Sequence, residues 1–463
     1  MMGNMIGAGI FIYPSLIASN LSHPILFLFI WVIGGLIAVC GALSSAELGS
    51  LFPEAGGDYV YLRNAYGKRW AFLYGFLTFT ITFPGSIALG LTLTIYFQGT
   101  AIFGDWVRSS AFNVPLLGTV YYYQLIATGL LLFLTIVNYF GLGASILLQK
   151  ITTLTPLAML LFVSLSVIVF FIGDIFHFSE FQKGIFFSNM NVPIGKIDPL
   201  KIGAALVPVY WTYMGWNSPL SLGAELKEPA RVIPRVMIFG PLFVMTIYFL
   251  FAFVFVSVIP YASIAEGKID PYFLIGKHFV YMLHENPNAA ESLIPKALSF
   301  LIALLVLGNV NSTILTGTRV SVALAQDGIL PAKISYLDRK RKTPVYSLAA
   351  QSLWVLILIF FISKDSDLLN FSFIAITILS IMTVFSVFIF RLKKEQKLAL
   401  YKTYLYPYTP LFYIIFSVCI IIAVILNYVF ENNLSVILYS IISIVAGLLF
   451  FEIWKRVNRE EIR

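Results

Sequence analysis

Glycine and proline interrupt two apolar stretches of this sequence, and their spacing points to a binding chemistry supplied by the main chain. The stretch GNMIGAGIF (3–11) holds three glycines and is followed by Pro14, and VPVYWTYMGWNSPLSLGAE (207–225) holds two prolines and Gly215. Proline removes a helical hydrogen bond and glycine weakens a helix interior, so both stretches are predicted to unwind. Unwound backbone exposes amides that attract a carboxylate and carbonyls that attract an ammonium group. The expected ligand therefore carries both a carboxylate and an ammonium group.

These stretches belong to a chain with the composition of a membrane protein. Its 463 residues are 59% hydrophobic and 11% charged, whereas soluble domains carry about 25% charged residues. In lipid only helices and closed barrels satisfy the backbone, and these apolar runs are too long and uniform for barrel strands. We predict an all-α integral membrane protein with twelve transmembrane helices, at residues 3–21, 25–52, 70–98, 119–141, 150–173, 203–222, 236–260, 297–321, 345–363, 366–390, 404–428 and 434–454.

The basic residues orient these spans. With the N-terminus inside, most of the 30 Lys and Arg residues fall in cytoplasmic loops, as the positive-inside rule requires. We predict a multi-pass protein of the cell (plasma) membrane whose N- and C-termini are cytoplasmic. The net charge of +8 is explained by these loops lying near anionic lipid, so no nucleic-acid partner is expected.

The interrupted stretches are the first and sixth spans, and each opens one half of the first ten. This placement predicts a five-plus-five inverted repeat with a site between the two breaks, near the middle of the membrane. Close helix packing is the alternative explanation for small residues, and we prefer it for Gly34–Gly35 in the second span. The predicted division is residues 1–173 (first repeat), 174–202 (outer loop), 203–391 (second repeat) and 392–463 (last two spans and tail).

Four separated stretches resemble the amino acid–polyamine–organocation (APC) transporter superfamily, closest to its L-type amino-acid transporter branch. Each lies on the matching span and side of the membrane, and together they cover the first ten spans. The stretches are MIGAGIFIYP (5–14), GALSSAELGSLFPEAGGDYVYLRNAYG (41–67), YWTYMGWN with GAELKEPARVIPR (210–235), and NVNSTILTGTRVSVALAQDGILP with TPVYS (309–347). The resemblance implies a secondary transporter that moves α-amino acids by alternating access.

It also implies roles for individual residues. Amides around Gly7, Ala8 and Gly9 are expected to bind the substrate carboxylate. Carbonyls near Met5 and in the sixth span are expected to bind its amino group. Trp211 stands where the family usually has an aromatic lid over the substrate. The predicted substrate-binding residues are Met5, Ile6, Gly7, Ala8, Gly9, Trp211, Met214, Gly215 and Asn217, and Asn217 is expected to hydrogen-bond the unwound region.

The sequence departs from the family pattern at three places. Met214 stands where the family usually has glycine, which changes the shape of the side-chain pocket. Many sodium-independent members carry a lysine midway along the fifth helix, where this chain has Thr155–Pro156, and Lys150 is expected at a cytoplasmic helix start. Only six residues precede Gly7, so a short inner half of the first helix is expected. The coupling ion stays open.

Charged residues near the cytoplasmic span ends are predicted to act as gates. Glu47, Glu225 and Arg319 are the candidates, because carboxylates there can pair with nearby cations. No acidic residue falls in the middle of a span, which favours a neutral amino acid over a polyamine or a cationic side chain. The segment from Asp58 to Gly67, rich in aromatic and basic residues, is predicted to lie along the inner membrane interface.

The sequence lacks the motifs of catalysis, so we expect no enzyme and no cofactor. The four histidines have no ligand spacing, and both cysteines, Cys40 and Cys419, fall inside spans. The outer loop 99–118 has no cysteine, so no disulfide-linked accessory subunit is expected; the expected partners are an amino acid and the lipid bilayer. An amino-acid exchanger, a carrier of polyamines or other organic cations, and a membrane sensor on a transporter scaffold remain alternatives.

Overall fold

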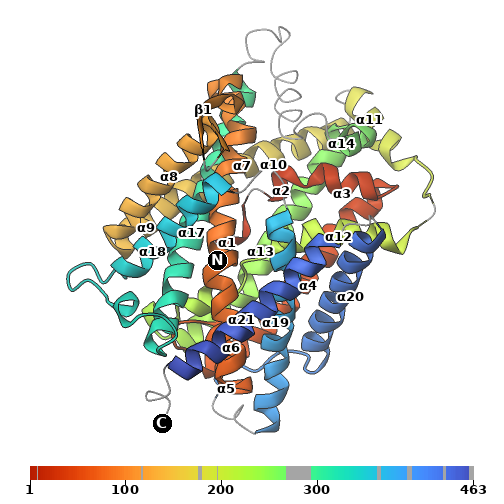
Figure 1. The fold of residues 1–463 in the computed structure, drawn as a ribbon. Coiled ribbons are helices and arrows are strands. Elements are labelled where there is room, and N and C mark those ends of the chain that lie inside the picture. The colour runs from red at the N-terminus through yellow and green to blue at the C-terminus, as the bar shows by residue number, and fades with distance from the viewer. Residues whose placement is uncertain are drawn as a thin grey trace.

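The computed structural model describes residues 1–7, 9–115, 118–175, 180–195, 197–266, 293–361, 367–393, 399–430 and 434–457. These residues form a helical bundle with a single two-stranded hairpin among them (Figure 1). The helices of the first half are α1 (Met2–Met5), α2 (Gly9–Ile12), α3 (Pro14–Asn20), α4 (Pro24–Leu51), α5 (Asp58–Tyr66), α6 (Lys68–Leu77), α7 (Phe83–Phe103), α8 (Tyr122–Tyr139), α9 (Leu142–Gln149), α10 (Thr155–Ile175) and α11 (Glu180–Met190).

The second half continues the helical pattern. Its helices are α12 (Pro199–Tyr213), α13 (Pro229–Val258), α14 (Tyr261–Glu266), α17 (Leu293–Gln326), α18 (Val345–Phe361), α19 (Asp367–Leu392), α20 (Tyr408–Phe430) and α21 (Ser435–Val457). Two π-helical turns, Thr78–Thr82 and Lys150–Leu154, join α6 to α7 and α9 to α10. Short 3₁₀ turns lie at Asp105–Arg108, Ser218–Ser221, Gly223–Glu225 and Ala332–Ser335.

Nine helical segments within the described residues are long and apolar enough to cross a membrane. These nine, the shorter apolar helix α18 and the two interrupted segments fall on the twelve predicted ranges. The all-helical membrane fold is therefore confirmed, whereas the number of crossings and the inverted repeat stay predictions. The fifth segment begins at Leu142, earlier than predicted, because a π-helical turn joins α9 to α10 into one segment.

Both predicted interruptions are present, and the local backbone explains each. The first segment unwinds after α1, where Ile6 has extended angles (φ −83°, ψ 92°), and helix resumes at Gly9. In the sixth segment α12 ends at Tyr213, Met214 is extended (φ −60°, ψ 156°) and Gly215 has φ +99°. Glycine adopts a positive φ of this size readily, whereas residues with a Cβ atom are strained in this conformation. Pro208, by contrast, lies within α12 without ending it.

Small residues let the long helices approach one another. The helix α4 packs along α13, and α7 packs along α17. A Cβ atom added to Gly34 would overlap Val209 of α12, and one added to Gly35 would overlap Met245 of α13. The prediction that Gly34–Gly35 serves helix packing is therefore confirmed.

We call the end of the bundle where α4 and α17 end and α13 begins the inner end, because the positive-inside rule predicts that it faces the cytoplasm. Figure 1 shows α5 at this end and the hairpin at the opposite, outer end. The hairpin, β1 (Ser110–Val114) paired antiparallel with β2 (Gly118–Tyr121), was not predicted for the loop 99–118. The interface prediction for Asp58–Gly67 was wrong for the first half of α5, because Tyr59, Val60, Tyr61 and Leu62 are at most 1% exposed.

Candidate functional site

A cavity of about 240 Å³ lies between the two interrupted segments. Its walls also include side chains from α6, α7, α17, α19 and α20. Of the predicted substrate-binding residues, the cavity is lined by Met5, Gly7, Gly9, Trp211, Met214, Gly215 and Asn217. Ile6 is fully buried and does not line it. Ala8 lies outside the described residues.

The two interruptions touch each other at glycine. A Cβ atom on Gly9 would lie 2.6 Å from Thr212 Oγ1, and one on Gly215 would lie 2.6 Å from the Asn4 carbonyl oxygen. Cβ atoms do not approach other atoms this closely, so hydrogen is the largest group either site accepts. The glycines therefore bring the backbone of the first segment against that of the sixth.

Met5, Gly7 and Gly9 of the first break line the cavity, and substrate binding by their main-chain groups stays a prediction. Neither Gly7 nor Gly9 donates its amide to another described residue. The Met5 carbonyl accepts a hydrogen bond of 2.7 Å from the Tyr248 hydroxyl of α13, which also lies 3.2 Å from the Thr212 carbonyl. A carbonyl oxygen has two lone pairs, so the Met5 carbonyl keeps one acceptor position.

Trp211 lies between this central cavity and a second cavity nearer the outer end. The outer cavity, also about 240 Å³, is bounded by residues of α3, α12, α19 and α20. Trp211 and Tyr13 line both cavities. The indole packs against Phe373 with ring centroids 5.3 Å apart. Trp211 thus stands at the place expected of an aromatic lid.

Asp58, the first residue of α5, lines the central cavity, and the sequence reasoning missed it. Its Oδ2 accepts a 2.6 Å hydrogen bond from the Asn217 amide and one of 3.4 Å from the Tyr74 hydroxyl. Burial raises the pKa of Asp58 to about 6. Asn217 was predicted to bond the unwound backbone and bonds this carboxylate instead. The available signal was Gly56–Gly57, two glycines with positive φ that turn the chain inward before Asp58.

A polar network on α17 holds the first segment in place. The Asn309 side-chain amide donates to the Asn4 carbonyl at 2.7 Å, and the Thr313 hydroxyl donates to Asn4 Oδ1 at 3.2 Å. Asn311, one turn away from the cavity, joins α17 to α9 through the Gln149 side chain at 2.9 Å. Such bonds between helices are the expected use of amides in a bundle.

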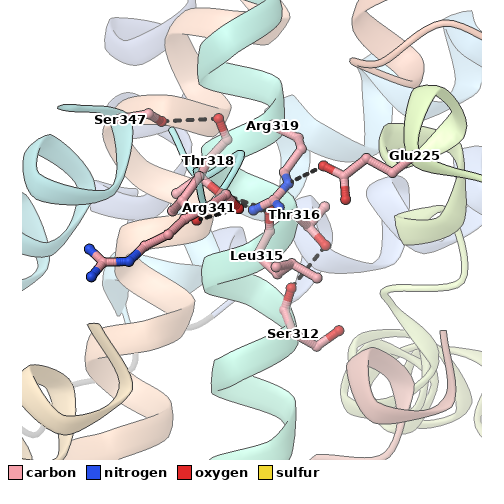
Figure 2. A network of polar contacts seen from close by, with 9 residues as sticks. Glu225, Ser312, Leu315, Thr316, Thr318, Arg319, Arg341 and Ser347 are labelled. Carbon is pink, nitrogen blue, oxygen red and sulfur yellow. Dashed lines mark hydrogen bonds and ion pairs between the residues drawn. The ribbon is translucent and has the colours of Figure 1, made fainter. Parts of the chain in front are cut away.

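The predicted gating residues are paired at the inner end. Arg319 of α17 donates through Nε to Glu225 Oε1 at 2.7 Å, and Figure 2 shows the two side chains meeting across the space between their elements. Asp327, near the end of α17, accepts from Arg63 of α5 at 2.7 Å and from the Tyr59 hydroxyl. Two carboxylate–arginine contacts therefore lie at the inner end, and their role as a gate stays a prediction.

Glu47 also forms an ion pair, but away from the cavity. Its carboxylate accepts from Arg391 of α19 at 2.7 and 3.0 Å and from the Thr403 amide and hydroxyl, each at 2.7 Å. The Arg391 guanidinium lies 3.7 Å from the centroid of the Tyr406 ring. Glu47 thus joins α4 to α19 and to the loop before α20.

The position predicted to correspond to the family's lysine, Thr155–Pro156, opens α10, and Thr155 is exposed. Before it, Thr152 and Thr153 are buried in the π-helical turn, and a Cβ on Gly308 of α17 would lie 2.6 Å from Thr153 Oγ1. Lys150 is exposed, but it lies at the π-helical turn within the segment and not at a helix start as predicted. Within the part of the chain that the structure describes, no Lys, Arg or His lines the central cavity, and Asp58 is its one carboxylate.

Comparison with known proteins gives consistent matches. Residues 1–451 match a family model described as amino acid permease. The chain is 29% identical to the serine/threonine exchanger SteT of Bacillus subtilis, over 89% of this chain and 85% of the relative. It is 25% identical to the b(0,+)-type amino acid transporter 1 of Mus musculus, over 97% and 85%. It is 28% identical to the large neutral amino acids transporter small subunit 2 of Homo sapiens, over 75% and 60%.

Proposed function

This chain belongs to the amino acid permease family of the APC superfamily, and we propose that it carries neutral α-amino acids across the membrane by alternating access. The family match and the names of the relatives indicate a transporter of amino acids and not an enzyme. The observation that carries the proposal is the cavity between two touching interruptions, whose walls include unpaired amides and available carbonyls.

In this proposal the substrate is held by its backbone charges. The carboxylate accepts from the amides around Gly7, Ala8 and Gly9, and the ammonium group donates to the carbonyls of Met5, Trp211 and Met214. Partial charges on unpaired main-chain groups favour such ions without the cost of burying charged side chains. Because every α-amino acid has these two groups, the remainder of the cavity selects the side chain.

A neutral side chain is the proposed preference. Two of the relatives are named for serine and threonine or for large neutral amino acids. The thioether side chain of Met214 adds an apolar surface to the cavity where the family usually has glycine. The argument from the absence of a buried acid is weakened by Asp58, so the preference rests on the relatives and on this apolar surface.

Access is proposed to alternate between the two ends. Trp211 is the outer lid, and Glu225 with Arg319 is the inner gate, while Glu47 with Arg391 holds α4 and α19 together as the inner end opens. The chain is proposed to lie in the plasma membrane with both termini in the cytoplasm. Its two cysteines lie in α4 and α20, so we propose that it works without a disulfide-linked accessory subunit.

Obligate exchange is the second candidate for the mode of transport, because one relative is named an exchanger. Uptake into purified proteoliposomes tests both modes. Labelled L-serine, L-alanine and L-leucine are added to vesicles that are empty or preloaded with unlabelled substrate. Saturable, stereoselective uptake is expected, and uptake that requires preloading would assign exchange.

Protein-free vesicles provide the background, and D-serine and putrescine serve as competitors. Entry of putrescine without entry of, or competition by, the L-amino acids would overturn the substrate class in favour of an organic-cation carrier. Flux that rises linearly with concentration would overturn the carrier mechanism in favour of a channel. Complete absence of flux with specific amino-acid binding would point to a sensor.

A further inference from the structure

Asp58 is a carboxylate without a cationic partner in a buried position. The residue is 4% exposed and lines the central cavity. Its Oδ2 accepts from Asn217 and Tyr74, whereas Oδ1 is fully buried and has no hydrogen-bond partner among the described residues. The titratable groups that act on it electrostatically are hydroxyls: Tyr61 of α5, Tyr74 of α6 and Tyr413 of α20.

This environment makes the ionisation of Asp58 less favourable than it is in water. Burial removes the water that would hydrate the charged carboxylate, and no cation compensates for this loss. The two neutral donors, Asn217 and Tyr74, replace the lost hydration only in part. Burial accordingly raises the pKa of Asp58 to about 6. A change in the hydration of the Asp58 carboxyl would therefore shift its pKa and change how much of it is protonated near neutral pH.

Asp58 is also placed where the inner end would have to open. The loop before it pairs with the sixth segment through a β-bridge between Ala55 and Leu222, and Asn217 of the same segment holds its carboxylate. The contacts Arg63–Asp327 and Arg319–Glu225 lie at this end. Parting these contacts would admit water to Asp58, and hydration lowers the pKa of a carboxyl towards its ordinary value.

We propose that Asp58 is the proton-binding carboxylate of the central cavity, protonated from the outer solution and deprotonated to the inner solution when the inner end opens, so that an amino acid and a proton move together. The inference rests on the proposed function, because the same cavity must take the amino acid. The buried Oδ1 has no hydrogen-bond partner among the described residues and can carry a proton. The fifth segment has Thr155–Pro156 where many family members carry a lysine, and among the described residues Asp58 is the one carboxylate that lines the cavity.

The test measures proton movement in proteoliposomes that enclose pyranine at pH 7.5. L-Serine and L-leucine are added outside at pH 5.5 or 7.5. The wild-type protein is expected to take up substrate at least fivefold faster at outer pH 5.5 and to acidify the lumen as substrate enters. Asp58→Asn, which keeps an acceptor oxygen but holds no proton, is expected to exchange substrate at the same rate at both pH values without acidifying the lumen. Glu228→Gln, an exposed acid at the inner end, is expected to behave as wild type.

Each other outcome has a definite meaning. Substrate uptake by the wild type with no lumen acidification would overturn the inference, and this arm does not depend on whether Asp58→Asn folds. A pH response retained in Asp58→Asn would also overturn it. Selective loss of competition by L-lysine or putrescine would instead make Asp58 a subsite for cationic side chains and overturn the proton role. If wild-type protein moves no amino acid at either pH, the proposed function fails and not only this inference.

Discussion

Gly9 of the first interrupted segment lies directly against Thr212 of the sixth, so close that a Cβ atom on Gly9 would come within 2.6 Å of Thr212 Oγ1. This contact joins the two segments beside the cavity. It also makes the site sensitive to the addition of a single side chain.

Gly9→Val is expected to abolish substrate binding. The added methyl groups must displace Thr212 or shift the first segment, and either movement misplaces the amides proposed to hold the carboxylate. Substrate-induced thermal stabilisation of the purified protein measures this. Gly129→Val is the matched control, because Gly129 is an exposed helical glycine with no atom within 4 Å of an added Cβ. Wild-type affinity in Gly9→Val would refute the placement of the carboxylate.

Trp211→Ala is expected to increase the rate of substrate dissociation by tenfold or more. The indole separates the central cavity from the outer one, so its removal joins them. Trp211→Phe should recover much of the loss, because a smaller ring still packs on Phe373. Dissociation of labelled substrate from detergent-solubilised protein reports the effect, with Trp106→Ala at the outer surface as control. Equal dissociation rates in wild type and Trp211→Ala would exclude a lid.

The contact between Glu225 and Arg319 is expected to couple the two residues energetically. Arg319 is 10% exposed and Glu225 32% exposed in their side chains, so water screens the pair only in part. A double-mutant cycle with Glu225→Gln and Arg319→Gln should give a coupling free energy of about 1–2 kcal/mol. The exposed pair Arg231–Glu228, with side chains 68% and 69% exposed, should give less than about 0.5 kcal/mol.

Cysteine labelling with the same Glu225→Gln variant distinguishes a gate from a purely structural contact. If the pair closes the inner end, Glu225→Gln should increase the labelling of Ser221→Cys by an impermeant maleimide added from the inner side, since Ser221 lines the cavity. Native cysteines are replaced for this measurement. Unchanged labelling, even with lower stability, would assign the pair a structural role alone.

Glu47→Gln is expected to destabilise the protein more than Glu225→Gln does. The Glu47 side chain is 4% exposed, and its loss leaves the Arg391 guanidinium, 18% exposed, without its countercharge. Breaking a buried pair costs about 3–5 kcal/mol, which should appear as a clear fall in melting temperature in detergent. Substrate affinity of the folded fraction should not change, because Glu47 does not line the cavity. A large loss of affinity at unchanged stability would contradict this.

The stability of the protein is expected to rise as the pH falls from 7 to 5. The folded-state pKa of Asp58 is raised to about 6 from an ordinary value of 3.8, so the folded chain binds this proton more tightly than the unfolded chain does. The gain through this interval is about 1 kcal/mol. Thermal unfolding at the two pH values should show it in wild type, and Asp58→Asn should show a correspondingly smaller difference. An identical pH response in both proteins would exclude Asp58 as its source.

The sequence predicted those features of the fold and site that depend on interactions within a few residues. Glycine and proline set backbone preferences within a few residues, so the two interruptions and the cavity between them could be predicted. The packing role of Gly34–Gly35 could be predicted for the same reason. Trp211 and Met214 were predicted from the resemblance to the APC superfamily, and both line the cavity.

What the sequence missed depends on contacts between distant segments. Asp58 reaches the cavity from the first position of α5, just after the turn at Gly56–Gly57, and it is held there by Asn217, more than 150 residues away. Glu225 and Arg319 were each predicted as gating residues, but the sequence did not show that they pair with each other. Helix packing at the inner end decides which charged groups face each other.

The Tyr248 hydroxyl lies within hydrogen-bond distance of both the Met5 carbonyl and the Thr212 carbonyl, and so connects the two unwound segments through α13. The acceptors are held apart at a fixed spacing before any substrate arrives. Much of the entropy of ordering them is therefore lost when the protein folds and not when it binds. A rigid shift of α13 would move the Met5 and Thr212 carbonyls together through the Tyr248 hydroxyl. Rotation of this one helix could therefore be coupled to the release of substrate.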